Sequence, residues 1–263
     1  MFFDSHAHYY DARFETEFDG GADALLKTLF DGEVCRIVNV GDSLKSSKKC
    51  IAQAARFPKM YAAAGIHPSC AGTECELDAS RRALCDMLDD AEKNKIVAVG
   101  EIGFDYHYDD TDRDVQRQYF EMQMRVAEMY GLPVIIHDRE AHGDCLDMVR
   151  KYPHVRGIFH SYSGSAETAA ELIRRGWMIS FSGVVTFKNA GRVRAAAKSV
   201  PLGKLLIETD CPYLAPHPHR GECNHSGLLR YTAETLAELH GVTVEELGRI
   251  TAENAASFFG INL

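Results

Sequence analysis

The feature that most constrains the fold is a regular alternation of short β-rich segments with longer amphipathic segments. Spread over 263 residues, eight candidate strands recur about every 33 residues, which is the spacing of a βα unit in a parallel barrel of ~250 residues. The sequence therefore predicts the α/β class, as a TIM (β/α)8 barrel in a single domain over residues 1–263. The candidate strands are 2–4, 34–40, 60–65, 96–101, 133–137, 157–160, 177–181 and 205–209.

Periodicity supports this alternation of strands and helices. Residues 114–130 carry apolar side chains at three- and four-residue spacing, and Gly131 follows where a helix would end. Residues 96–99 and 134–136 are continuously apolar, as strands buried on both faces of a parallel sheet must be.

Composition limits the class of partner and the compartment. The formal charge of −9 argues against a broad basic surface wrapped on duplex DNA, although a small pocket for a strand end remains compatible with it. The eight cysteines form no CxxC pair, which favours a reduced intracellular protein. Because neither a signal peptide nor a membrane-length apolar run is found, we expect a cytoplasmic monomer without membrane contact.

A pair of histidines at the end of the first candidate strand indicates a metal site. Side chains at i and i+2 of a strand share a face, so His6 and His8 can present two imidazoles to one point. Four later strands also end near a residue of ligand type, and the active site of a parallel barrel lies at these C-terminal ends. These residues are Glu101, His137, His160 and Asp210.

Six such ligands suit two divalent ions, which need a carboxylate bridge to offset their repulsion. We predict that one ion takes His6, His8, Glu101 and Asp210, and that the other takes Glu101, His137 and His160. Imidazole and carboxylate ligands are compatible with Zn, Mn, Mg, Co or Ni. Metal-activated water would then be the nucleophile of a hydrolysis, with Asp210 as the catalytic residue that holds or deprotonates it and with no organic cofactor.

Three further side chains lie near the expected strand ends and could bind substrate. His67 ends the third strand, Lys188 follows the seventh, and Arg220 follows the eighth. We expect His67 to donate to a phosphate oxygen, and Lys188 and Arg220 to act as phosphate clamps.

These motifs resemble the TatD family of metal-dependent deoxyribonucleases, within the amidohydrolase-like hydrolases. The resemblance covers nearly the whole chain in the family's order, and it implies a TIM barrel, a divalent metal centre on the six ligands, and hydrolysis of DNA from the 3′ ends of single strands. The matching segments are Asp-Ser-His-Ala-His at 4–8, Gly-Ile-His-Pro at 65–68, Gly-Glu-Ile-Gly-Phe-Asp-Tyr at 100–106, Pro-Val-Ile-Ile-His at 133–137, His-Ser-Tyr-Ser-Gly at 160–164 and Glu-Thr-Asp-Cys-Pro-Tyr-Leu at 208–214.

Two positions depart from the family pattern. Ser69 stands where the family usually has a second histidine after His-Pro. The loop after Gly221 usually reads Lys-Arg-Asn-x-Pro in the family, whereas here residues 222–226 read Glu-Cys-Asn-His-Ser. This loop has lost two positive charges and gained a negative one, which weakens the case for strong binding of a phosphate backbone.

Two alternatives remain open on the sequence alone. Related barrels use the same ligand order to hydrolyse a small amide or lactone, although many of them bridge their metals with a carboxylated lysine where this chain has Glu101. The second alternative is a barrel that binds metal but catalyses no reaction. Nothing in the sequence supports it, because none of the six ligands is replaced.

Overall fold

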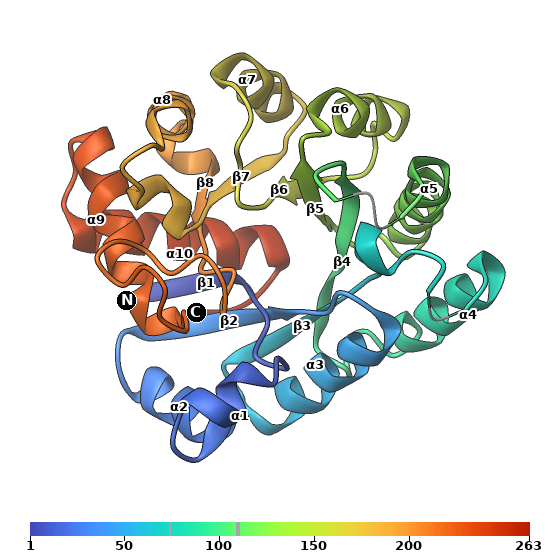
Figure 1. The fold of residues 1–263 in the computed structure, drawn as a ribbon, viewed down its shortest axis with the longest axis horizontal. Helices are drawn as coiled ribbons and strands as arrows, with labels where there is room; N and C mark the ends of the chain where they lie inside the picture. Colours follow the sequence, from blue (N-terminus) through green and yellow to red (C-terminus); the bar gives the residue numbers. More distant parts are fainter. Residues whose placement is uncertain (74, 109–110) are drawn as a thin grey trace. The chain divides into compact units, whose positions relative to one another are not determined.

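The computed structural model describes residues 1–73, 75–108 and 111–263 (Figure 1). Strands and helices alternate along this part of the chain, which contains eight strands. The chain divides into two compact units, residues 1–39 with 160–174 and 178–263, and residues 40–159 with 175–177. These are unit 1 and unit 2 below, and a single domain over residues 1–263 stays a prediction.

Unit 1 contains strands from both ends of the chain. Its strands β7 and β8 pair in parallel, as do β1 and β2, and Ala7 at the end of β1 forms a parallel bridge with Cys211. The neighbour order is therefore β7, β8, β1, β2. The elements are β1 (Phe2–Ala7), α1 (Arg13–Glu17), α2 (Gly21–Asp31), β2 (Val34–Val40, whose last residue belongs to unit 2), α7 (Ala166–Arg174), β7 (Met178–Phe181), η2 (Gly183–Thr186), α8 (Gly191–Ser199), η3 (Leu202–Lys204), β8 (Leu205–Ile207), η4 (Ser226–Leu228), α9 (Leu229–His240) and α10 (Val244–Phe259).

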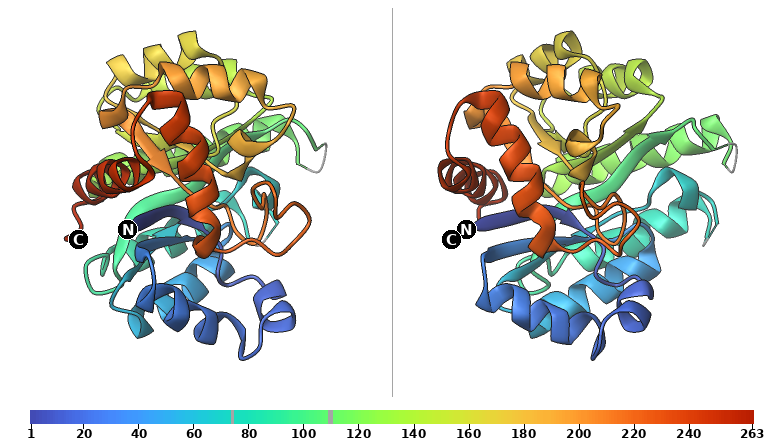
Figure 2. Two further views of the ribbon diagram at one scale, coloured as in Figure 1. Left: turned by 90° about the vertical axis from the view of Figure 1, so that its left-hand side faces the viewer. Right: turned by 60° about the vertical axis from the view of Figure 1, so that its left-hand side comes forward.

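Helix α10 covers β1 and β8 with a buried, largely apolar face. It packs on β1 and β8 beside α9 (Figure 2), and the rings of Phe259 and Phe3 stack with centroids 6.1 Å apart. The helix begins where the Thr243 hydroxyl accepts a hydrogen bond from the Glu246 N–H, and it ends at Gly260 in the left-handed conformation.

Unit 2 is a run of parallel strands in chain order, β3 to β6, with helices between them. Helix α5 ends at Gly131 (φ +66°), as its sequence pattern predicts. The elements are α3 (Leu44–Arg56), β3 (Met60–Ala64), η1 (Pro68–Cys70), α4 (Leu77–Leu88), β4 (Ile96–Asp105), α5 (Arg113–Tyr130), β5 (Val134–Arg139), α6 (His142–Lys151) and β6 (Gly157–Phe159).

All eight candidate strands are present, but six of the expected strand ends differ: β3, β6 and β8 end one or two residues earlier than predicted, and β1, β4 and β5 end two to four residues later. β1 runs on to Ala7, so His6 lies within the strand. β4 continues to Asp105 and β5 to Arg139, because their pairing persists beyond Glu101 and His137. Glu101 and His137 therefore lie inside their strands, with paired residues both before and after them in the chain.

Candidate metal centre

Backbone pairing in unit 1 brings the first histidine pair to Asp210. The Asp210 N–H donates to the carbonyl of His6 at 2.9 Å, and the His8 N–H donates to the carbonyl of Cys211 at 2.8 Å. Residues far apart in the chain are thus held in one parallel register at the C-terminal end of β1.

The side chains of these residues converge. His6 Nε2 lies 3.1 Å from His8 Nε2, and Asp210 Oδ1 lies 3.1 Å from His8 Nε2 and 3.6 Å from His6 Nε2. Two ligands ~2.1 Å from a tetrahedral zinc ion are about 3.4 Å apart. The spacing and chemistry of this donor set therefore fit a divalent cation.

Asp210 is held as a carboxylate in a strained backbone position. Burial alone would raise the pKa of this carboxyl, but the hydrogen bond with His8 and the nearby imidazoles of His8, His6 and His160 lower it below its ordinary value. The backbone φ of Asp210 is +56°, in the left-handed region that non-glycine residues seldom adopt and that clusters at functional sites.

A fourth predicted ligand of unit 1, His160, lies against His6. Their rings stack with centroids 4.1 Å apart and planes 13° apart. Glu208, which sequence reasoning missed, lies beneath His160: its Oε1 is 3.3 Å from His160 Nδ1 and accepts from the Ser161 N–H at 2.6 Å. Among the described residues its fully buried Oε2 has no hydrogen-bond partner.

Candidate ligand atoms of His6, His160 and Glu208 all lie within 4.8 Å of one another. A carboxylate on the far nitrogen of a metal-binding histidine fixes its tautomer and ring orientation. Glu208 can do this for His160. The signal in the sequence was its position two residues before Asp210.

Asp4 stabilises the backbone around this cluster through hydrogen bonds and is not a candidate ligand. It accepts from the Thr209 hydroxyl at 2.6 Å, the Ser226 hydroxyl at 2.7 Å and the Thr209 N–H at 3.0 Å. Complete burial raises the pKa of Asp4 to about 7 against the lowering effect of these hydrogen bonds. Asp4 thus ties β1 to the segment after β8 and to η4.

Unit 2 holds the other predicted ligands. Glu101 Oε1 lies 2.7 Å from His137 Nδ1 and 3.7 Å from His67 Nε2. Asp105, another residue that sequence reasoning missed, has its Oδ2 3.2 Å from His137 Nε2. Burial, with the nearby His137, lowers the pKa of His67 to about 3, so its imidazole is neutral and suited to a metal.

Lys188 and Arg220 line one cavity of about 300 Å³ in unit 1, together with Phe187, Asn189 and His217. The Arg220 guanidinium lies over the Phe187 ring, 3.7 Å from its centroid. Lys188 and Arg220 are both exposed, so the cavity presents two cations to solvent.

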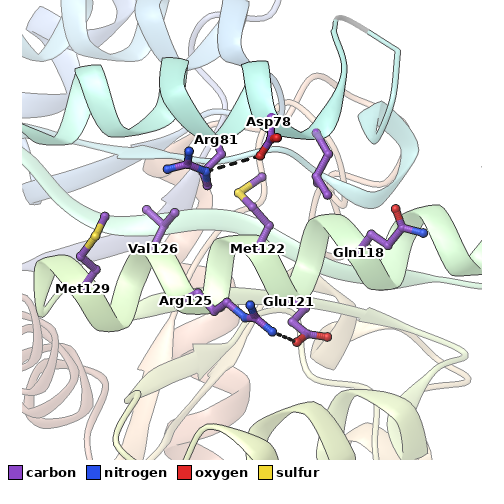
Figure 3. A pocket seen from close by; sticks show the side chains of 9 residues that line it. Asp78, Arg81, Gln118, Glu121, Met122, Arg125, Val126 and Met129 are labelled. Carbon is purple, nitrogen blue, oxygen red and sulfur yellow. Dashed lines mark hydrogen bonds and ion pairs between the residues drawn. The ribbon is translucent and has the colours of Figure 1, made fainter.

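A larger cavity, of about 500 Å³, lies between α4 and α5 of unit 2 (Figure 3). Its arginines are already paired, Arg81 with Asp78 at 3.7 Å and Arg125 with Glu121. None of the predicted site residues lines it.

A family model described as TatD related DNase matches residues 3–260. The chain belongs to this family. It is 37% identical over 264 residues to the "Uncharacterized metal-dependent hydrolase YabD" of Bacillus subtilis, and the match covers 100% of each chain. It is 40% identical over 200 residues to YcfH of Escherichia coli K12, described in the same words, covering 75% of this chain and 73% of the relative.

Solved structures agree with the family. YjjV, a TatD homologue from Escherichia coli K12, aligns with a TM-score of 0.89 at 28% identity, covering 99% of this chain and 98% of that one. A phosphotriesterase homology protein from Escherichia coli aligns with a TM-score of 0.70 at 13% identity over 98% of each chain, which shows a likeness of fold alone.

These comparisons confirm the TatD family, the α/β TIM (β/α)8-barrel fold class and a metal-dependent hydrolase. The ligand and substrate roles of individual residues stay predictions. No helix within the described ranges has the length and apolarity to cross a membrane.

Proposed function

We propose that this TatD-family hydrolase cleaves phosphodiester bonds of DNA, as an exonuclease acting from the 3′ ends of single strands. The observation that carries the proposal is the convergence of His6, His8 and Asp210, with ligand atoms 3.1–3.6 Å apart. The description of the matching family as TatD related DNase supports DNA as the substrate.

We assign His6, His8, Glu101, His137, His160 and Asp210 as the ligands of two divalent cations. The bridging role of Glu101, the identity of the metals and a monomeric state stay predictions from the sequence. Bound divalent cations would lower the pKa of the attacking water and stabilise charge on the phosphoryl oxygens.

Asp210 is the proposed proton acceptor. The attacking water gives its proton to this carboxylate, whose lowered pKa keeps it ionised at neutral pH. The hydrogen bond between Asp210 Oδ1 and His8 orients the carboxylate, and the rings of Tyr10 and Tyr213 lie edge-on to His8.

Lys188 and Arg220 are the proposed phosphate-binding residues. They line one cavity from two separate loops. Together they supply positive charge for a phosphate group, which residues 222–226 do not. A cavity of about 300 Å³ suits a terminal nucleotide better than a duplex, in keeping with the overall charge of −9.

The test is a panel of 5′- and 3′-blocked single-stranded oligonucleotides, incubated with the protein and added Mg, Mn or Zn. We expect cleavage of strands with a free 3′ end, protection by a 3′ block, and loss of turnover in Asp210→Asn. A lactone and a cyclic amide are assayed in parallel. Turnover of either without oligonucleotide cleavage, or an Asp210→Asn variant as active as the parent, would refute the proposal.

A further inference from the structure

The proposed function assigns side chains to the metals and to phosphate groups, but none to a nucleobase. Tyr213 of unit 1, in the loop after β8, lies next to the donor set around His8. The two rings have centroids 6.4 Å apart and planes at 63°. Tyr213 is 47% exposed, whereas His6 and His8 are at most 5% exposed. An aromatic ring therefore reaches solvent at the edge of a buried donor set.

Three hydrogen bonds hold Tyr213 in this exposed position. Its hydroxyl donates to Asp11 Oδ2 at 2.9 Å, and its N–H donates to the Asp210 carbonyl at 3.0 Å. Its carbonyl accepts from the Asn224 side chain at 2.7 Å. Asp11 is itself held, because its Oδ1 accepts from the Arg13 N–H at 2.8 Å. The ring therefore has little rotamer freedom left to lose when a ligand binds.

A second ring lies beside the same imidazole. Tyr10 follows His8 by two residues and meets the His8 ring edge-on, with centroids 5.7 Å apart and planes at 80°. Tyr10 is partly buried, so Tyr213 presents more exposed aromatic surface. Because the Tyr213 hydroxyl already donates to Asp11, what this side chain offers a ligand is chiefly its ring. The two tyrosines thus form an aromatic pair beside a predicted metal ligand.

A fixed and exposed aromatic ring is the kind of surface on which single-stranded nucleic acids stack their bases, because every base has a π-face. Tyr213 is one side chain removed from the donor set, since His8 Nε2 lies 3.1 Å from Asp210 Oδ1. A nucleobase is similarly one sugar removed from its phosphate. A strand end whose phosphate lies at the donor set can therefore place its base against Tyr213.

Stacking also agrees with the charge of the chain and with a single-stranded substrate. It contributes affinity without positive charge, which suits a formal charge of −9. In a duplex, the terminal base must be unpaired and unstacked before it can meet a protein ring, and this costs free energy. A single-stranded end has no pairing to lose. Contact with Tyr213 therefore favours single strands over duplex ends.

We propose that Tyr213, with Tyr10 as a second wall, forms a subsite for the 3′-terminal nucleobase of a single strand. The proposal deepens the proposed function and rests on it for the class of substrate. Because stacking reads no base edge, the subsite should accept all bases and bind purines more tightly than pyrimidines.

The first test separates the base from the rest of the substrate. KM is measured for two single-stranded oligonucleotides that differ only in a stable abasic sugar at the 3′ end of the second. We expect loss of the base to raise KM about tenfold for the parent and to have little effect for Tyr213→Leu, which lacks the ring. Tyr213→Phe keeps the ring and should respond as the parent does. So should the control Tyr61→Leu, near the N-terminal end of β3.

The second test measures binding without turnover. An oligonucleotide with a 3′-terminal 2-aminopurine, which fluoresces less when it stacks, and with phosphorothioate linkages that resist cleavage is bound to metal-loaded protein. Emission of the bound oligonucleotide should be lower with the parent and Tyr213→Phe than with Tyr213→Leu. Equal emission from the three complexes, or the same effect of the abasic end on the parent and Tyr213→Leu, would overturn the proposal.

The outcomes separate this subsite from the proposed function. Lower emission with the parent than with Tyr213→Leu, without cleavage of the unmodified strand, would keep the nucleobase subsite and remove the nuclease. Cleavage with a KM that does not depend on the terminal base would keep the nuclease and remove the subsite.

Discussion

Gly103 is a position where a single methyl group should separate two strands. It is paired with His137 in the β4–β5 register and has a φ of +143°. An added Cβ would lie 2.0 Å from the carbonyl oxygen of His137, well inside the 3.0 Å limit of real Cβ contacts. Because the clashing atom belongs to the backbone, it can move only if the strands move apart.

The cost of Gly103→Ala follows from these contacts. Backbone strain at the positive φ costs about 1–3 kcal/mol. Two ladder hydrogen bonds lost between β4 and β5 add about 0.5–1.5 kcal/mol each. We therefore expect a loss of about 2–6 kcal/mol, a large share of the ~5–15 kcal/mol typical of a folded protein. His137, which is paired with Gly103, should move with the strand, so binding of divalent metal should also weaken.

Urea unfolding measures this loss. Trp177, the one tryptophan in the sequence, is buried against Phe159 of β6 and provides a fluorescence signal within unit 2. Two control variants separate the effects: Gly131→Ala has a positive φ of +66° with no atom within 4 Å, and Gly203→Ala has open space around it. The order of loss should be 103, then 131, then 203. A Gly103→Ala variant no less stable than Gly131→Ala would refute the reasoning.

Three further predictions concern charges. Lys188→Ala and Arg220→Ala should each raise the KM for a single-stranded oligonucleotide about tenfold, ~1.4 kcal/mol, without changing metal content, and an unchanged KM would remove the phosphate role. Glu208→Gln should weaken metal binding about 10- to 100-fold by loosening His160, measured by competition with a chelator; binding equal to the parent would leave Glu208 a purely structural residue. Burial lowers the pKa of His240, whose Nε2 contacts a backbone carbonyl of α8. As the pH falls, His240 is therefore protonated in the unfolded state before it is protonated in the folded state. Stability should be intact above pH ~6.5 and fall as the pH drops below it. His240→Gln should reduce this fall in urea unfolding at pH 5–7, and an identical fall in the variant would contradict it.

Strand positions could be predicted because buried parallel strands are continuous apolar runs, a property of the local sequence. Their ends were harder to predict. In β4, the predicted strand ended at Glu101, but pairing with β5 carries the strand through to Asp105. The length of a strand depends on its pairing with a neighbouring strand, which the sequence of one strand alone does not determine.

The same limit applies to the site. Residues 101, 103 and 105 alternate onto one face of β4, so the position of Asp105 could have been found by extending the strand by four residues. The position of Glu208 two residues before Asp210 placed it near the site, but its role became visible only from its contact with His160 in the folded chain. Lys188 and Arg220 lie in different loops, and only the folded chain brings them to one cavity.

The stacking of Arg220 on Phe187 has a consequence for how an anion would be captured. A free arginine loses up to ~2 kcal/mol of rotamer entropy when it is immobilised, and a guanidinium already resting on an aromatic ring has lost part of that freedom beforehand. The uncharged Phe187 ring therefore preorganises the Arg220 guanidinium for binding an anion. Affinity for a phosphate group at this cavity should depend on the flat surface of that ring as well as on the number of cations around it.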